Sequence, residues 1–206
     1  MLIIQSKTSS VLRGIFRILA PLQKFPMQII KTPFEGLFIL EPRVFSDSRG
    51  FFLETWNTQV FKGLNLDIDF TQDNQSHSQA GVLRGLHFQK PPHAQGKLVR
   101  VSRGSALDIV VDIRKESPTF GKHFKIKLNA EKAQALWIPA GFAHGFLALE
   151  EHTVFQYKCD ALYAPQAEDC LLWNDPSLNI DWGHNAPIIS DKDQEGKLLT
   201  DLNSPF

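Results

Sequence analysis

The chain is a succession of short segments in which apolar residues alternate with polar or small ones. Such alternation is typical of β-strands with one buried face, and the segments are 37–40, 51–56, 70–77, 82–89, 97–102, 106–113, 123–128, 135–138, 145–149 and 153–159. Turn signals such as Ser48-Arg49-Gly50 separate them. Many short strands in close succession predict an all-β fold. The expected architecture is an antiparallel jelly roll with a few short peripheral helices, near 58–62, after 130 and around 191–199.

The length and composition of the chain fit a single domain with a full hydrophobic core. The chain has 206 residues, of which 43% are hydrophobic, and 16 of them are phenylalanine. Sandwiches and barrels of this size commonly fold undivided. We therefore expect one domain over residues 27–206.

The first 26 residues differ in kind from the rest and are treated as an N-terminal extension. They contain no acidic residue, and Arg13 and Arg17 interrupt their apolar run, which is therefore too short and too charged to span a bilayer. A basic, acid-free start is one pattern of organelle-targeting peptides. The alternative that we favour is that Met27 is the true beginning, with Gln28-Ile29-Ile30 as the first strand.

The balance of charges gives no reason to expect nucleic acid or a membrane as a partner. The 22 basic and 22 acidic residues cancel, so the chain carries no net charge that would attract either. Cys159 and Cys170 are too few for a disulfide framework. We expect both to be reduced thiols of a cytoplasmic protein.

Two histidines lie within apolar, strand-like sequence. His87 stands in segment 82–89, and His144 directly precedes segment 145–149. Burying an unsatisfied polar group costs about 1–3 kcal/mol, so each imidazole needs a partner or a function. Because Arg84 and Lys97 are close in sequence, these residues predict one polar cavity inside an apolar barrel.

A metal is the first candidate for such a cavity, because jelly rolls of the cupin type bind divalent metals through clustered histidines and glutamates. The stretch from Pro139 to His144 resembles the second cupin motif. Around His87, however, the second histidine and the glutamate of the first motif are missing, and residues 74–107 contain no acidic replacement. Three protein ligands are not assembled, so we expect no metal.

What remains is acid–base chemistry on an anionic substrate. Arg84, Lys97 and Arg100 form a cationic group near His87, which suits a phosphate ester. A histidine is a competent general base near neutral pH, and Tyr157 is a candidate for the opposing acid. We expect no catalytic role for three other charged residues, which we interpret as pairs at strand ends: Asp108, Asp112 and Arg114.

Motifs in order along residues 28–193 resemble those of the dTDP-4-dehydrorhamnose 3,5-epimerase family, which consists of metal-free, cupin-fold enzymes of deoxysugar nucleotide synthesis. The motifs are Asp47-Ser48-Arg49-Gly50-Phe51-Phe52-Leu53-Glu54, Gln72-Asp73-Asn74, Arg84-Gly85-Leu86-His87-Phe88-Gln89, Ala94-Gln95-Gly96-Lys97-Leu98-Val99, Val111-Asp112-Ile113-Arg114, Ser117-Pro118-Thr119-Phe120-Gly121, Gly141-Phe142-Ala143-His144-Gly145-Phe146 and Trp173-Asn174-Asp175. Motifs matching in this number and order are not expected by chance. The resemblance implies the family's cupin-like jelly roll, a double-stranded β-helix.

The resemblance implies an isomerase that works without a cofactor on a dTDP-4-keto-6-deoxyhexose. The ketone at carbon 4 acidifies the hydrogens on carbons 3 and 5, and return of each proton from the opposite face inverts that carbon. By resemblance, His87 is the base, Tyr157 is the acid, and Lys97 stabilises the enolate oxygen. Asp193 matches the residue that pairs with the base, and Asp191 is the rival for that position.

The resemblance also implies which residues contact the substrate. They are Arg49, Glu54, Gln72, Asn74, Arg84, His144, Glu168 and Lys192. Members of the family are dimers in which N-terminal strands contribute to the neighbour's site, so we expect a homodimer. Two alternatives stay open: a relative that epimerises one carbon or moves a keto group, and a non-catalytic jelly-roll module that binds an anionic sugar.

Overall fold

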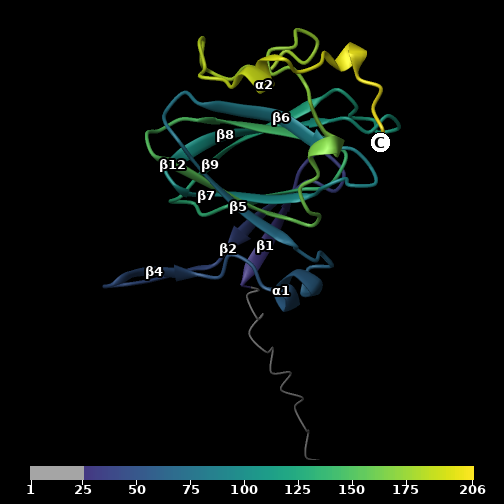
Figure 1. Cartoon of the computed structure of the whole chain (residues 1–206). Helices are drawn as coiled ribbons and strands as arrows, with labels where there is room; N and C mark the ends of the chain where they lie inside the picture. The colour runs from purple at the N-terminus through teal and green to yellow at the C-terminus, as the bar shows by residue number, and fades with distance from the viewer. Residues whose placement is uncertain (1–25) are drawn as a thin grey trace, which may run out of the picture.

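The computed structural model describes residues 26–206, which form two antiparallel sheets facing each other (Figure 1). The expected extension over residues 1–26 lies outside this range apart from Pro26. The six-stranded sheet has the order β1 (Met27–Lys31), β2 (Phe38–Pro42), β10 (Ala135–Ile138), β7 (Lys97–Arg103), β12 (Thr153–Cys159) and β5 (Gln72–Ser78). The five-stranded sheet has the order β13 (Glu168–Cys170), β6 (Leu83–Gln89), β11 (Phe142–Ala148), β8 (Ser105–Asp112) and β9 (His123–Asn129). Every pairing within these sheets is antiparallel, which confirms the expected all-β jelly roll.

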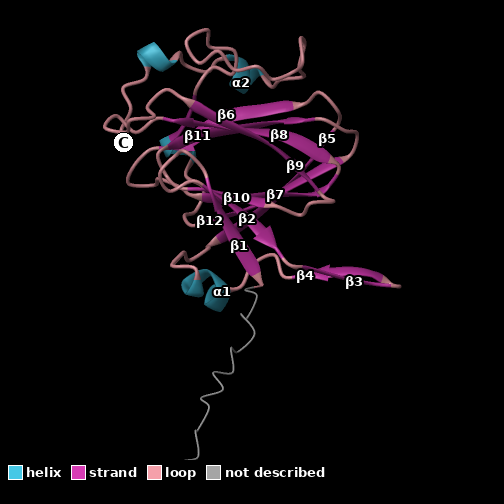
Figure 2. Cartoon of the chain, turned by 180° about the vertical axis from the view of Figure 1, so that it is seen from behind, coloured by secondary structure: helices cyan, strands magenta, loops and turns pink. Residues whose placement is uncertain are grey.

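A hairpin projects sideways from the barrel and forms a small sheet of its own. It consists of β3 (Val44–Asp47) and β4 (Gly50–Leu53), and both views show it standing clear of the two large sheets (Figures 1 and 2). At its tip, the Asp47 carboxylate accepts hydrogen bonds from the backbone and the guanidinium of Arg49. The hairpin therefore carries a charged tip away from the body of the chain.

The helices are short and peripheral, as expected. They are α1 (Thr58–Gly63), η1 (Pro165–Ala167), α2 (Asp191–Gln194) and η2 (Leu199–Asp201). Asn57 caps α1, since its side chain accepts hydrogen bonds from two backbone N–H groups of the first turn. After residue 130 the chain makes a turn instead of the expected helix, and the expected piece over 191–199 is divided into α2 and the start of η2. Within residues 26–206, no helix is both long enough and apolar enough to cross a membrane.

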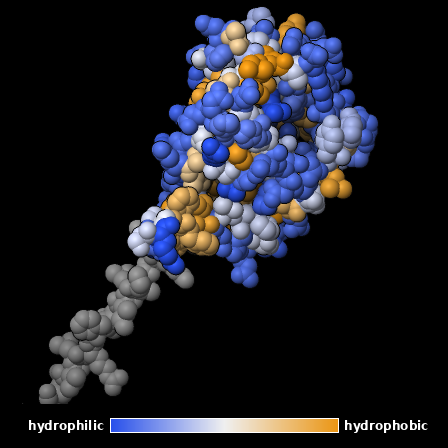
Figure 3. All heavy atoms as spheres, turned by 60° about the vertical axis from the view of Figure 1, so that its left-hand side comes forward, coloured by the Kyte–Doolittle hydropathy of each residue, from blue (hydrophilic) through white to orange (hydrophobic). Residues whose placement is uncertain are grey.

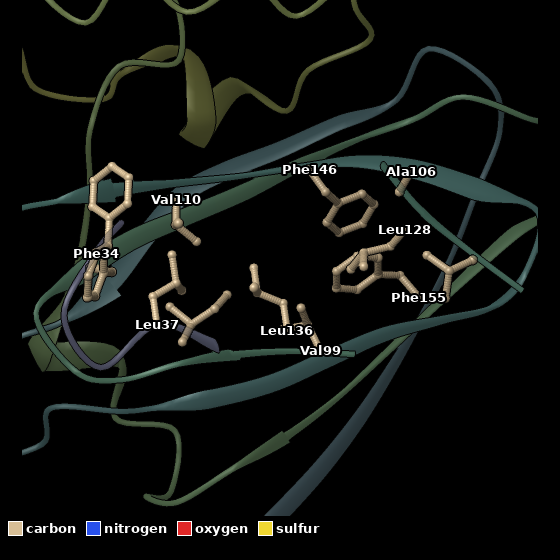
Figure 4. Close-up of a cluster of buried hydrophobic side chains, with 12 residues drawn as sticks. Phe34, Leu37, Val99, Ala106, Val110, Leu128, Leu136, Phe146 and Phe155 are labelled. Atoms are coloured by element: carbon tan, nitrogen blue, oxygen red, sulfur yellow. The ribbon is translucent and has the colours of Figure 1, made fainter. Parts of the chain in front are cut away.

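The central core lies between the two large sheets. Val99 and Phe155 come from the six-stranded sheet, while Val110 and Phe146 come from the five-stranded sheet, and Figure 4 shows them pointing toward one another. The rings of Phe146 and Phe155 are stacked, with centroids 4.0 Å apart. Alternate residues of each strand thus fill the barrel, as the period of two predicts.

The outer faces of the two sheets are covered as well. The C-terminal segment packs Leu171 and Trp182 against the five-stranded sheet, and it appears in yellow above β6 in Figure 1. On the other side, Phe61 of α1 packs against Leu98 and Trp137 of the six-stranded sheet. Strands of both sheets are therefore buried on two faces.

The strand prediction was wrong at four strands, for different physical reasons. Every residue of β11 is buried, so the strand shows no alternation at its start and begins at Phe142 rather than at 145. β3 was missed because all its residues are exposed, and β13 because it has only 3 residues. β4 ends at Leu53, short of the predicted 56, because the chain then turns into the cap of α1.

The carboxylate of Asp112 anchors the loop that follows β8. It is fully buried and accepts hydrogen bonds from Arg114, Ser117 and Thr119, which confirms the expected pairing with Arg114. Burial alone would raise the pKa of Asp112, but these hydrogen bonds outweigh it and hold the pKa at about 2. The ionised carboxylate therefore stabilises the fold above its unfolded pKa, and this contribution is lost as the pH falls toward 2.

Asp112→Asn is expected to lower the free energy of unfolding at neutral pH by about 2 kcal/mol or more. This is the free energy that corresponds to the lowering of the Asp112 pKa on folding. The variant should also lose the decline in stability between about pH 4 and about pH 2 that this carboxylate causes. Denaturant unfolding across that range measures both effects, with the exposed Asp67→Asn as the matched control. Identical pH profiles for Asp112→Asn and the wild type would contradict the assignment.

Candidate active site

A cavity of about 340 Å³ opens between the two large sheets. It is lined by Ser76, Arg84, His87, Lys97, His144, Phe146, Phe155, Tyr157, Tyr163, Glu168, Ser190, Lys192 and Asp193. The space-filling view shows a hollow in a mainly hydrophilic face, with hydrophobic atoms visible inside it (Figure 3). The cavity thus combines an aromatic interior with a charged rim.

The two sheets supply different chemistry to this cavity. Arg84 and His87 belong to β6 of the five-stranded sheet, whereas Lys97 and Tyr157 belong to β7 and β12 of the six-stranded sheet. The imidazole and the phenol therefore stand on walls that belong to opposite sheets. A substrate between them would be flanked on two sides by groups that exchange protons.

A bulge in β6 allows both Arg84 and His87 to reach the cavity. The register pairs His87 with His144 and Arg84 with Phe146, so three steps along β6 match two steps along β11. Gly85 lies inside this bulge at a φ of +130°, and a Cβ there would come within 2.4 Å of the Cα of Gly145. Only glycine fits at this position, which keeps the two strands close enough to hold the histidines side by side.

His87 and Asp193 form a hydrogen-bonded dyad in the cavity, and this dyad is a candidate for proton transfer. Its Nε2 lies 2.7 Å from Oδ1 of Asp193, which is buried in α2 and also accepts the backbone N–H of Gly85. Burial alone would raise the pKa of Asp193, but the hydrogen bond and charge of His87, together with hydrogen bonds from Gly85 and Ser190, outweigh it, and the pKa lies below its ordinary value. The carboxylate is therefore ionised and accepts the Nε2 proton, which leaves the Nδ1 lone pair of a neutral His87 as the basic atom. Asp193, rather than Asp191, contacts the predicted base.

His144 forms a second, deeper dyad that sequence reasoning missed. Its Nε2 lies 2.9 Å from Oδ2 of Asp108, and both side chains are buried. Oδ1 of Asp108 has no hydrogen-bond partner among the described residues. Asp108 was expected to pair at a strand end, and that interpretation is wrong: Asp108 lies within β8 and orients His144.

Lys97 and Tyr157 are both half-buried in the wall that the six-stranded sheet contributes to the cavity. Burial lowers the pKa of Lys97, although nearby acidic groups such as Glu168 oppose this. No carboxylate within residues 26–206 forms an ion pair with the Lys97 ammonium, and Lys97 lines the cavity. Burial raises the pKa of the Tyr157 phenol, which therefore keeps its proton at neutral pH and can donate it.

The mouth of the cavity carries an ion pair and a phenol. Lys192 lies 2.5 Å from Glu168, and the hydroxyl of Tyr163 donates to the same carboxylate oxygen at 2.6 Å. Burial alone would raise the pKa of Glu168, but the hydrogen bonds from Lys192 and Tyr163 outweigh it and lower the pKa. The charges of Lys192 and Glu168 at the mouth are therefore paired with each other.

The structure brings most of the predicted site residues together, and four lie elsewhere. Glu54 accepts a hydrogen bond from Asn57, beside α1, and Arg49 occupies the tip of the projecting hairpin. Gln72 and Asn74 share the face of β5 that also carries Ser76, and they are hydrogen-bonded to each other. Gln72 also accepts the backbone N–H of Tyr163, so this pair supports the mouth without lining the cavity.

Several lining residues were not predicted from the sequence. Phe146 and Phe155 lie two residues from His144 and Tyr157 on the same strands, so the period of two could have identified them. Ser190, by contrast, reaches the cavity from a loop and carries no periodic signal.

The described residues contain one group of three side chains that could hold a metal ion. The group consists of His87, Cys170 and Asp193, whose ligand atoms lie within 4.8 Å of one another. Cys159 and Cys170 are both free thiols, as expected. The group overlaps the dyad, so metal binding and proton transfer would use the same imidazole.

The chain is similar to one family of known proteins along most of its length. The family model described as dTDP-4-dehydrorhamnose 3,5-epimerase matches residues 31–201. A curated enzyme of that name from Shigella flexneri is 49% identical over 178 residues, which cover 86% of this chain and 98% of the relative.

Two solved structures place the fold among sugar-nucleotide epimerases. One is the dTDP-6-deoxy-D-glucose-3,5-epimerase of Legionella pneumophila in complex with dTDP-4-keto-L-rhamnose (TM-score 0.82, 44% identity, covering 86% of this chain and 95% of that one). The other is a 3′-monoepimerase of Streptomyces bikiniensis in complex with dTDP-quinovose (TM-score 0.78, 34% identity, covering 82% and 86%). The chain is an isomerase and belongs to the dTDP-4-dehydrorhamnose 3,5-epimerase family.

Proposed function

We propose that this protein inverts carbons 3 and 5 of dTDP-4-dehydro-6-deoxy-D-glucose to give dTDP-4-dehydro-L-rhamnose, a step of dTDP-rhamnose biosynthesis. The observation that carries the proposal is that His87 of the five-stranded sheet, paired with Asp193 of α2, and a protonated Tyr157 of the six-stranded sheet line one cavity. The reaction as proposed uses no metal and no cofactor. Both cysteines are free thiols, which suits a cytoplasmic location.

The proposed reaction is a pair of proton transfers next to a ketone. Nδ1 of His87 removes the proton from carbon 3 or 5, and Asp193 stabilises the imidazolium that forms. The electron pair moves onto the oxygen at carbon 4, where the ammonium of Lys97 stabilises the enolate. Tyr157 then donates its proton to the carbon from the opposite face and recovers a proton from solvent, while His87 releases the one that it took.

The cationic side chains suit the diphosphate of the proposed substrate. Arg84 lines the cavity wall and Lys192 its mouth, so both can contact an anionic group that extends from the sugar. His144, oriented by Asp108, supports the sugar from the floor. Glu168 pairs with Lys192 and fixes that ammonium in place.

We also propose that residues 27–206 act as one domain and that the protein is a homodimer whose hairpin completes the partner's site. Arg49 and Glu54, two predicted substrate contacts, lie on or just after the hairpin and away from the cavity of their own chain. Phe51 and Phe52 on the hairpin are 66% and 69% exposed, which is unusual for large apolar side chains of a monomer. A second copy would cover these rings and receive Arg49.

Hybrid dimers test this arrangement. One subunit carries Arg49→Ala and the other His87→Asn, and each variant alone is expected to have little activity. If the hairpin serves the partner, every hybrid dimer has one intact site and about half the wild-type turnover. Hybrids purified through two different tags and assayed for turnover give the answer. A hybrid no more active than its parents would contradict the exchange of hairpins.

Tyr157→Phe separates proton removal from inversion. The variant keeps the base and the enolate-stabilising ammonium, so deuterium from solvent should still enter the substrate on the original face. Inversion should fall by about 10²-fold or more, because the opposing acid is gone. Nuclear magnetic resonance of the recovered sugar nucleotide measures both quantities. Tyr163→Phe, at the mouth, is the comparison and should impair inversion far less; equal effects would contradict the assignment of Tyr157.

The function itself is tested by product identity. Incubation with dTDP-4-dehydro-6-deoxy-D-glucose, followed by magnetic resonance of the sugar ring, should show configurations inverted at both carbons. Inversion at one carbon would place the chain with enzymes such as the Streptomyces bikiniensis 3′-monoepimerase. Binding of the sugar nucleotide without turnover would identify a non-catalytic module.

A further inference from the structure

The thiol of Cys170 lies beside the catalytic dyad but has no place in the proposed reaction. In the β6–β13 ladder, Cys170 stands directly opposite His87, so the two side chains share a face. Cys170 is buried and does not line the cavity, and its thiol donates a hydrogen bond to the neighbouring Leu171 carbonyl. The sulfur is thus a potential metal ligand beside the dyad that the proposed proton transfer does not use.

Together, His87, Cys170 and Asp193 offer nitrogen, sulfur and oxygen ligands from three different elements. Their ligand atoms lie within 4.8 Å of one another, while neighbouring ligands of a tetrahedral zinc lie about 3.3–3.8 Å apart. Shifts of about 1 Å would therefore close the set around a metal. Because His87 and Asp193 line the cavity, the remaining coordination position would face the cavity. A set with a thiolate and an imidazole favours zinc-like metals over magnesium.

We propose that His87, Cys170 and Asp193 form an inhibitory binding site for Zn²⁺ and for other metals that prefer nitrogen and sulfur ligands. The metal takes the Nε2 lone pair of a neutral His87, whose remaining proton then resides on Nδ1. The Cys170 thiol proton passes to solvent, and the resulting thiolate and the Asp193 carboxylate complete the protein ligands. His87 then has no free lone pair, so it cannot remove a proton from the substrate. Inhibition, though not binding, rests on the proposed role of His87 as the base.

Cobalt provides a readout that does not depend on turnover. Co²⁺ occupies zinc sites, and a thiolate ligand gives it a charge-transfer absorption in the near ultraviolet. The surface pair His77 and His152, whose ring nitrogens lie 3.3 Å apart, is a second place for a metal to bind. All proteins in the test therefore carry His152→Asn, in the full-length chain treated first with chelator.

In this background, one equivalent of Co²⁺ should produce the charge-transfer band. Cys170→Ser and Cys170→Ala should both lose it while keeping their turnover, and the control Cys159→Ser should retain the band. Zn²⁺ should inhibit the parent protein, and the concentration for half inhibition should rise about tenfold or more in the Cys170 variants. Mg²⁺ should not inhibit.

Absence of the band in the parent protein, or its persistence in both Cys170 variants, would overturn the metal site. Equal zinc inhibition with and without Cys170 would overturn its inhibitory role. A parent protein that shows the band but never turns over the sugar nucleotide would support the metal site and refute the epimerase function instead. The two proposals can therefore fail separately.

Discussion

His87→Asn is expected to abolish deuterium exchange at both carbons 3 and 5 and to lower kcat by about 10²–10⁴-fold, the usual contribution of a general base. Asparagine can still donate a hydrogen bond to Asp193, so the buried carboxylate keeps a partner and the fold is retained. What the variant loses is the basic lone pair on the cavity side. Exchange is followed by magnetic resonance of the substrate in deuterated water.

The exposed His77→Asn is the matched control, since it removes an imidazole on the outside of the barrel and should leave exchange unchanged. Denaturant unfolding of both variants should give the wild-type stability within about 1 kcal/mol. Exchange at the wild-type rate in His87→Asn would show that another group is the base, and His144 with its Asp108 partner would be the next candidate.

Lys97→Met is expected to lower kcat by about 10²–10³-fold, because the enolate oxygen loses the cation that stabilises its charge. Methionine keeps most of the length and apolar volume of the side chain, so the change is mainly electrostatic. Proton exchange and inversion should fall in parallel, since both follow the enolate. This pattern differs from that of Tyr157→Phe, where exchange survives and inversion does not.

Lys158→Met is the control for Lys97. Lys158 lies on the neighbouring strand, β12, and pairs with Asp73. The Lys158→Met substitution therefore removes a cation from the same sheet but not from the cavity. Its turnover should stay near that of the wild type. If Lys97→Met reduced inversion while exchange continued at the wild-type rate, the ammonium would act after the enolate has formed, contrary to the proposal.

Most of the barrel could be predicted from alternation, because strands such as β5 and β12 bury one face more than the other. The prediction was wrong where this condition does not hold. β11 is buried on both faces, and β3 is exposed on both. Neither strand has the contrast between faces on which a period of two depends.

The candidate site was predictable where its residues follow the period of a strand or a family motif. In a regular strand, Arg84 and His87 would point to opposite faces of the sheet, because they are three residues apart. The bulge at Gly85 brings both side chains to the face that lines the cavity. Asp193 comes from α2, far along the chain, and only the family resemblance pointed to it. Asp108 gave no local signal, since its partner His144 lies on a different strand.

The most direct test of the account is deuterium incorporation by the wild-type protein in the presence of a chelator. With dTDP-4-dehydro-6-deoxy-D-glucose in deuterated water, both carbon 3 and carbon 5 should acquire deuterium, and both should be inverted. An unlabelled carbon, or exchange that begins only after a divalent metal is added, would contradict metal-free proton transfer between His87 and Tyr157.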